Sequence, residues 1–139
     1  MSASTKLSTS VKALCYLART HSEPKTSSQI AENIGVNASK LRKILSMLVK
    51  NNIVESTQGA TGGFILKKEI DKLHLQEIYC AVEDRKAFHL NVSKSNGNYS
   101  SETTKLNDFF LDLFSDIQVE IEEKMRKLTL KSVLDKIEE

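Results

Sequence analysis

The sequence predicts a mainly α-helical fold with one small β-hairpin. Apolar residues recur at helical spacing in several separate segments. Three of the five glycines lie together in residues 58–63, between two short runs of β-forming residues. The 139 residues have the length of about one domain, large enough to form a core without metal or disulfide support. No run approaches the roughly 18 apolar residues of a membrane span.

The amino-terminal segments predict one helix followed by a closely joined helix pair. Residues 7–18 carry a single apolar stripe with the i, i+4, i+7 spacing of an amphipathic helix. Thr26 opens a Thr-x-x-Gln capping box, and Gly35 is a favoured stop for the short helix that follows. Asn37 is a favoured N-cap for a third helix that ends near residue 51. Two short amphipathic helices joined by a glycine turn are typical of a helix-turn-helix.

A hairpin is expected directly behind this helix pair. Residues 53–57 and 64–67 are the two β-like runs, and the glycine-rich residues 58–63 between them form its long tip. A helix-turn-helix with a β-hairpin behind it is the winged-helix arrangement. The sequence therefore predicts a winged helix-turn-helix within residues 1–86.

The remaining segments predict three more helices and a loop. Residues 75–83 have a short apolar face, and residues 87–104 are largely polar and are expected to form a flexible loop. Residues 105–128 return to helical periodicity, and Thr129 is placed to cap a short final helix. We expect residues 105–139, the long helix and the final one, to complete a single compact domain.

Charge is distributed unevenly along the chain. Residues 1–86 carry 13 Lys and Arg against 8 Asp and Glu, a net charge of +5, whereas residues 87–139 carry 7 against 10, a net charge of −3. Residues 33–54 contain no acid, although the chain's 18 acids in 139 residues would place about three there. A surface that faces phosphate has a physical reason to exclude carboxylates. The alternative is a solvated basic helix face with no partner.

We therefore expect this half of the chain to bind double-stranded DNA. At the start of the third helix, Asn37 and Ser39 are suited to hydrogen bond phosphates or base edges. Lys40 and Lys43 are suited to neutralise phosphates, and Arg42 can in addition contact guanine in a bidentate manner. The amino end of the preceding helix and the hairpin tip supply the other expected DNA-binding residues: Ser27, Ser28, Gln58, Gly59 and Thr61.

These features together resemble the Rrf-two type of winged helix-turn-helix transcriptional regulators, which include IscR, NsrR and CymR. The resemblance covers most of the chain, and its most specific piece is the glycine-rich wing followed by an aromatic residue. Family members usually carry arginine before the first wing glycine, where this chain has Gln58. The matching segments are residues 13–18 and 28–31, the turn that leads to Leu41, and residues 48–53, 56–59, 62–64, 75–78, 81–83 and 128–134.

The resemblance also bears on the cofactor. Cluster-binding members of the family place three cysteines between the fourth helix and the long helix, but residues 84–104 contain none. Iron–sulfur clusters are held mainly by thiolates, and the two cysteines of this chain, Cys15 and Cys80, fall in predicted helices outside that segment. We expect no cofactor, as in the cluster-free branch of the family. Cys15 and Cys80 are expected to be two inert core thiols, with a redox sensor as the alternative.

The long helix has an apolar face wider than one small domain should cover. The resemblance implies that this face pairs with the same helix of a second subunit, and the alternative is packing on the domain's own core. The expected interface residues are Leu106, Phe109, Phe110, Leu113, Phe114 and Ile117.

These observations predict a cytoplasmic, homodimeric DNA-binding transcriptional regulator. We expect it to repress transcription from an inverted-repeat operator, without a membrane partner and with an unidentified small-molecule or redox effector. The alternative is a winged-helix protein-interaction module that does not bind DNA, since fold alone does not determine function. No catalytic constellation or phosphate-binding loop stands out, so an enzyme is not expected.

Overall fold

The computed structural model describes residues 3–83 and 100–138, and it confirms a mainly α-helical fold with one antiparallel hairpin. None of the helices in these two ranges is long and apolar enough to cross a membrane. In chain order the elements are α1 (Ala3–Arg19), α2 (Ser27–Ile34), α3 (Ala38–Lys50), β1 (Val54–Thr57), β2 (Gly63–Leu66), α4 (Leu75–Val82), α5 (Ser101–Arg126) and α6 (Leu130–Ile137).

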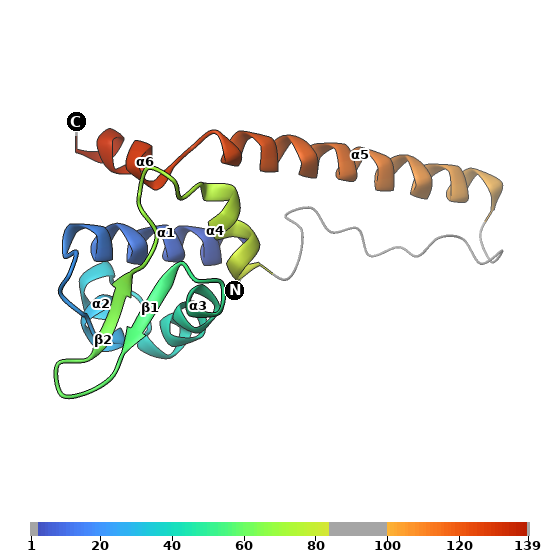
Figure 1. Ribbon diagram of the computed structural model, residues 1–139. Helices are drawn as coiled ribbons and strands as arrows, with labels where there is room; N and C mark the ends of the chain where they lie inside the picture. The colour runs from blue at the N-terminus through green and yellow to red at the C-terminus, as the bar shows by residue number, and fades with distance from the viewer. Residues whose placement is uncertain (1–2, 84–99, 139) are drawn as a thin grey trace.

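The first four helices and the hairpin form a body from which α5 projects (Figure 1). The core of this body is aliphatic, and burying each such side chain contributes about 1.5–3 kcal/mol. α6 returns from the end of α5 to pack along α1, so the carboxy-terminal helix joins the same core. The largest fully buried side chains are Leu14, Leu17, Ile30, Leu41, Ile44, Leu45, Leu48, Ile53, Val54, Leu73, Ile78 and Leu130.

The caps of α2 and α3 confirm the predicted helix-turn-helix. The Thr26 hydroxyl accepts from the Gln29 amide at 3.1 Å, and the Gln29 side chain accepts from the Thr26 amide at 2.9 Å. Gly35 ends α2 in the left-handed region with φ of 72°. The Asn37 side chain then accepts from the amides of the first turn of α3. Residues 35–37 therefore form the tight turn that connects α2 to α3.

The wing hairpin is joined on one side by the chain that leads into α2. Lys25 and Phe64 exchange two backbone hydrogen bonds, of 3.1 and 2.8 Å, and so form an isolated bridge beside β2. Gly63 lies at this junction, where an added Cβ would meet the Lys25 carbonyl carbon and oxygen at 2.6 Å. The Gly63 amide also donates to the Thr57 hydroxyl at 3.0 Å. Glycine at position 63 is therefore required by the close approach of the Lys25 backbone.

We expect Gly63→Ala to destabilise the domain by about 1–3 kcal/mol, because the new Cβ must displace the Lys25 backbone. Denaturant unfolding of the variant measures this change. Gly59→Ala is the matched control: Gly59 also has positive φ, at 105°, but an added Cβ meets no atom within 4 Å. Equal losses in the two variants would show that backbone conformation, and not the clash with Lys25, determines the cost.

The carboxy-terminal helices begin where their caps place them. Thr129 and Ser132 form a capping box at α6, as the sequence predicted for Thr129. The long helix starts earlier than predicted: residues 101–104 are helical and not loop, because the Ser100 hydroxyl accepts from the Thr103 amide at 3.1 Å. The rest of the predicted loop, residues 87–99, lies outside the described residues.

Candidate nucleic-acid interface

α3 is sharply divided between a buried and a charged face. Leu41, Ile44, Leu45 and Leu48 are at most 1% exposed and fix the rotation of the helix against the core. The opposite face is consequently turned to solvent, because apolar and polar residues alternate with helical period. The predicted DNA-binding side chains that lie exposed on this face are Ser39, Lys40, Arg42 and Lys43, with Asn37 at its start.

Two further exposed residues, Ser46 and Lys50, extend this face and were not among the expected DNA-binding residues. Counted from Ser39 as position i, Lys43 is i+4, Ser46 is i+7 and Lys50 is i+11. This spacing places all four residues along one side of the helix. The signal was present in the sequence as this spacing. We define the α3 face as Ser39, Lys40, Arg42, Lys43, Ser46 and Lys50.

The cations of the α3 face are not engaged elsewhere in the protein. Among the residues that the structure describes, neither Arg42 nor the three lysines of this face forms an ion pair. Carboxylates flank the acid-free stretch only at its ends, where Glu32 and Glu55 are both exposed. An uncompensated row of cations on a rigid helix is suited to displace counterions from a phosphate backbone.

The amino end of α2 presents backbone amides at the surface of the protein. The first amides of a helix lack intrahelical partners, and the capping box satisfies the Gln29 amide through Thr26. The amides of Ser27 and Ser28 are left for an external acceptor such as phosphate. Ser28 is exposed and Ser27 half-buried, so the Ser28 hydroxyl is the better placed of the two.

The wing tip projects from the same body. Gln58, Gly59 and Thr61 are exposed there, at the end of the hairpin that extends beyond α2 and α3 (Figure 1). The tip, residues 58–63, has no basic side chain, and the residue before its first glycine is Gln58. Any contact that the wing makes is therefore a neutral hydrogen bond and contributes less than the charged α3 face.

A helix-turn-helix with an exposed basic second helix and a flanking wing defines the class of winged helix-turn-helix regulators. The family model Rrf2, described as an iron-dependent transcriptional regulator, matches residues 3–136. The chain belongs to the Rrf2 family of transcriptional regulators.

Individual relatives support this assignment. YwgB of Bacillus subtilis, named as a candidate HTH-type transcriptional regulator, is 29% identical over 118 residues, covering 82% of this chain and 71% of its own. IscR of T. potens superposes with a TM-score of 0.69 at 25% identity over 96% of this chain and 85% of its own. CymR of B. subtilis, titled a global cysteine regulator, shares the fold with a TM-score of 0.65 at 22% identity. The match covers 93% of this chain and 92% of the CymR chain.

The donor groups of this chain do not fit an iron–sulfur cluster. Such clusters are held mainly by cysteine thiolates, and the whole sequence contains two cysteines. Cys15 is buried on α1, and Cys80 is exposed on α4. Within residues 3–83 and 100–138, no three His, Cys, Asp or Glu side chains are grouped to hold a metal ion.

The two thiols differ in their surroundings, and the expectation of two core thiols was wrong for Cys80. Tyr79 and Val82 turn toward the core, which leaves Cys80 on the side of α4 that faces Glu122 of α5. Partial desolvation by the neighbouring helix raises the pKa of the exposed Cys80 thiol, and the Glu122 carboxylate raises that pKa further. Burial likewise raises the pKa of Cys15. Because the thiolate is the reactive form, neither environment favours a redox sensor.

Replacing Glu122 with Gln should lower the pKa of Cys80, because the substitution removes the carboxylate that opposes ionisation of the thiol. Cys80 should then react with iodoacetamide faster at neutral pH, and its pH–rate profile should move to lower pH. Peptide mapping by mass spectrometry follows Cys80 separately from Cys15. Glu123→Gln, at an exposed neighbour on α5, should leave the profile unchanged. A profile that Glu122→Gln does not move would assign the raised pKa to burial alone.

Proposed function

We propose that this protein is a homodimeric, sequence-specific DNA-binding regulator that represses transcription. The observation that carries this proposal is the α3 face, on which four exposed cations lie without an ion-pair partner among the described residues and without an acid from residue 33 to residue 54. The family assignment supports the same class of function. A dimer bound across a promoter would repress by occluding it.

In the proposed complex, α3 enters the major groove. Arg42 reads a guanine through its bidentate guanidinium, and Lys40 and Lys43 contact phosphates on either side. The amides of Ser27 and Ser28 bind a phosphate at the amino end of α2. The wing tip then lies against the adjacent minor groove, where Gln58 and Thr61 are within reach of the backbone and base edges.

The competing function is a protein-interaction module. A protein docking surface has no general reason to exclude carboxylates, because such surfaces use both charges and depend on a fully desolvated apolar centre. The α3 face has no large apolar residue at its exposed positions. Both features favour DNA over a protein partner.

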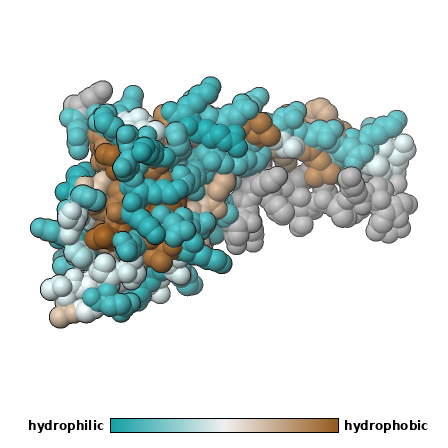
Figure 2. Space-filling view, viewed as in Figure 1, coloured by the Kyte–Doolittle hydropathy of each residue, from teal (hydrophilic) through white to brown (hydrophobic). Residues whose placement is uncertain are grey.

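The proposed dimer is supported by the exposed apolar face of α5. The exposed fraction is 51% for Leu106, 59% for Phe109, 40% for Phe110 and 37% for Leu113, and these residues span two turns of α5. Apolar side chains accordingly lie on the surface of the projecting helix (Figure 2). Only Gln118 and Met125 of α5 are buried in the described structure. Within the described residues, the exposed side chains from Leu106 to Leu113 are not covered by the domain's own core, and a second copy of α5 would cover them.

Selection of bound duplexes from a random DNA pool tests the proposal. A dimer presents two α3 faces about one two-fold axis, so the selected sequences should contain an inverted repeat. The centres of its half-sites should lie about 34 Å apart, or a multiple of this distance. DNA upstream of the protein's own gene should compete with the selected site. A pool that shows no enrichment at moderate salt would favour the protein-interaction module.

We further propose that the regulator acts without an iron–sulfur cluster. Protein purified without oxygen should be colourless, with no charge-transfer absorption and negligible iron and sulfide. This follows from the absence of cysteine in residues 84–104 and from the separate positions of Cys15 and Cys80. Absorption spectra together with iron and sulfide analysis measure the outcome. Stoichiometric iron and sulfide that are lost in a Cys15→Ser or Cys80→Ser variant would contradict it.

A further inference from the structure

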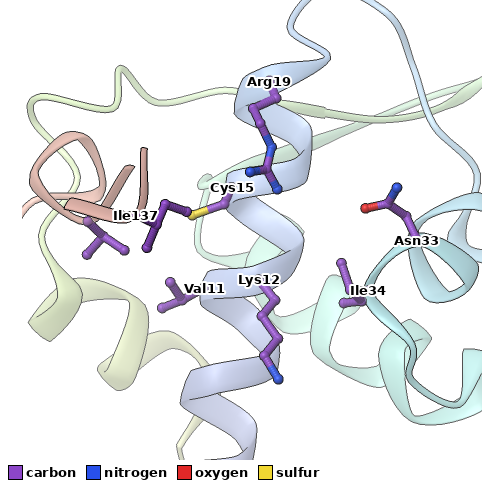
Figure 3. Close-up of a pocket in the computed structure, with 8 residues that line it drawn as sticks. Val11, Lys12, Cys15, Arg19, Asn33, Ile34 and Ile137 are labelled. Carbon is purple, nitrogen blue, oxygen red and sulfur yellow. The ribbon is translucent and has the colours of Figure 1, made fainter. Parts of the chain in front are cut away.

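A cavity of about 330 Å³ lies between α1, α2 and α6, apart from the α3 face. Its wall is mainly aliphatic and comes from all three helices: Val11 of α1, Ile34 of α2, and Val133 and Ile137 of α6. Cys15 of α1 completes the wall, with its sulfur directed to the side of α1 on which Ile137 lies (Figure 3). A cavity of this size and lining is suited to a small ligand with an apolar body.

The polar residues that line this cavity are two cations and one amide. Lys12 and Arg19 extend from the exposed side of α1, and Asn33 adds an amide from α2 (Figure 3). Among the described residues, neither Lys12 nor Arg19 forms an ion pair. An acidic group also acts here: the charge of Glu138, at the end of α6, acts on Cys15 against that of Arg19. The lining residues include two cations and an amide but no carboxylate, which favours an anionic ligand group.

We propose that this cavity binds a small organic acid that has an aliphatic chain. Its carboxylate lies between Lys12 and Arg19 and accepts a hydrogen bond from the Asn33 amide. Its chain lies among Ile34, Val133 and Ile137. Charge complementarity at the rim selects the acid over an alcohol or amine of equal length, because the apolar wall alone does not distinguish them.

Such a ligand would connect the DNA-binding and carboxy-terminal parts of the molecule. Asn33 and Ile34 are the last residues of α2, immediately before the Gly35 turn that orients α3. Val133 and Ile137 belong to α6, which follows α5 directly. A ligand that contacts both groups would change operator affinity, and this regulatory part of the inference rests on the proposed function.

NMR titration of the full chain with octanoate tests binding directly and without DNA. We expect saturable shifts with one octanoate per chain, and weaker binding of octylammonium, which has the same chain and the opposite charge. The Lys12→Gln/Arg19→Gln double variant should bind octanoate at least tenfold more weakly. Lys131→Gln, which removes a charge from α6 outside the cavity, is the matched control and should bind within twofold of the wild type.

Alkylation of Cys15 locates the ligand. In a Cys80→Ser variant, Cys15 is the single thiol of the chain, and octanoate should slow its reaction with iodoacetamide. Equal binding of octylammonium, or binding that the double variant does not weaken, would overturn the proposal. Binding without protection of Cys15 would also overturn it, and would place octanoate elsewhere, for example on the apolar face of α5. Loss of octanoate binding on dimerisation would assign the cavity to a second copy of the chain.

The effect of octanoate on operator binding is measured separately from octanoate binding itself. Octanoate at saturation should change the affinity for a selected operator at least threefold in the wild type and leave it unchanged in the Lys12→Gln/Arg19→Gln variant. Octanoate binding with no change in operator affinity would retain the binding site and remove its regulatory role. Octanoate binding by a protein that selects no DNA sequence would contradict the proposed function and leave the ligand site standing.

Discussion

Replacing Arg42 and Lys43 together with alanine should weaken operator binding by about 100-fold near 0.1 M salt. Loss of a bidentate guanine contact by Arg42 costs about 1–3 kcal/mol and relaxes sequence preference at that base pair. Loss of a phosphate contact by Lys43 weakens binding to all sequences alike and lowers the dependence of log affinity on log salt by about one. Fluorescence anisotropy of labelled duplexes over a range of salt concentrations separates the two effects.

The two single variants and one distant variant serve as controls. Arg42→Ala alone should reduce discrimination between operator and random DNA, whereas Lys43→Ala should reduce both affinities equally. Lys136→Ala removes an exposed cation from α6, far along the chain from α3, and should leave binding unchanged. Because Arg42 and Lys43 are exposed, the fold should survive, which circular dichroism checks. Unchanged operator affinity in the double variant would exclude α3 as the recognition helix.

Placing a carboxylate in the apolar face of α5 should dissociate the proposed dimer. In Phe110→Asp or Leu113→Asp, association would bury an unpaired charge at a cost of several kcal/mol, which is comparable with the stability of a whole domain. Operator binding should fall with it, because each free subunit presents one α3 face. Light scattering at micromolar concentration measures the dimer, and anisotropy measures operator affinity.

α5 itself offers a matched control. Val119 is also apolar and 51% exposed, but it lies on the opposite side of the helix from Phe110 and away from Leu113. Val119→Asp should therefore leave the dimer intact. Wild-type protein that is monomeric at micromolar concentration and still binds its operator tightly would remove both the dimer and the inverted repeat from the proposal.

Local signals in the sequence predicted most of the fold. Thr26, Gly35 and Asn37 placed the ends of α2 and α3 correctly, because capping depends on side chains within one turn of the backbone they satisfy. Thr129 did the same for α6. The start of α5 was missed because residues 101–104 are all polar, so the apolar periodicity on which the prediction depended begins only at Leu106.

Features that depend on two distant segments could not be predicted. The pairing of Lys25 with Phe64 leaves no pattern in either segment alone. The exposure of Cys80 depends on where α5 crosses α4, since Cys80 lies among apolar residues in the sequence. The charged side of α3, by contrast, followed from periodicity, although Ser46 and Lys50 were left out of the expected DNA-binding residues.

The bridge between Lys25 and Phe64 connects the wing hairpin directly to the amino end of α2. Its two hydrogen bonds tie β2 to the residue immediately before Thr26, the N-cap of α2. Fraying of the hairpin would therefore release the capped end of α2 as well, and ordering of either segment would order the other. Two surfaces proposed to touch separate stretches of the DNA backbone would thus order together, and they would engage or release the duplex in one cooperative step.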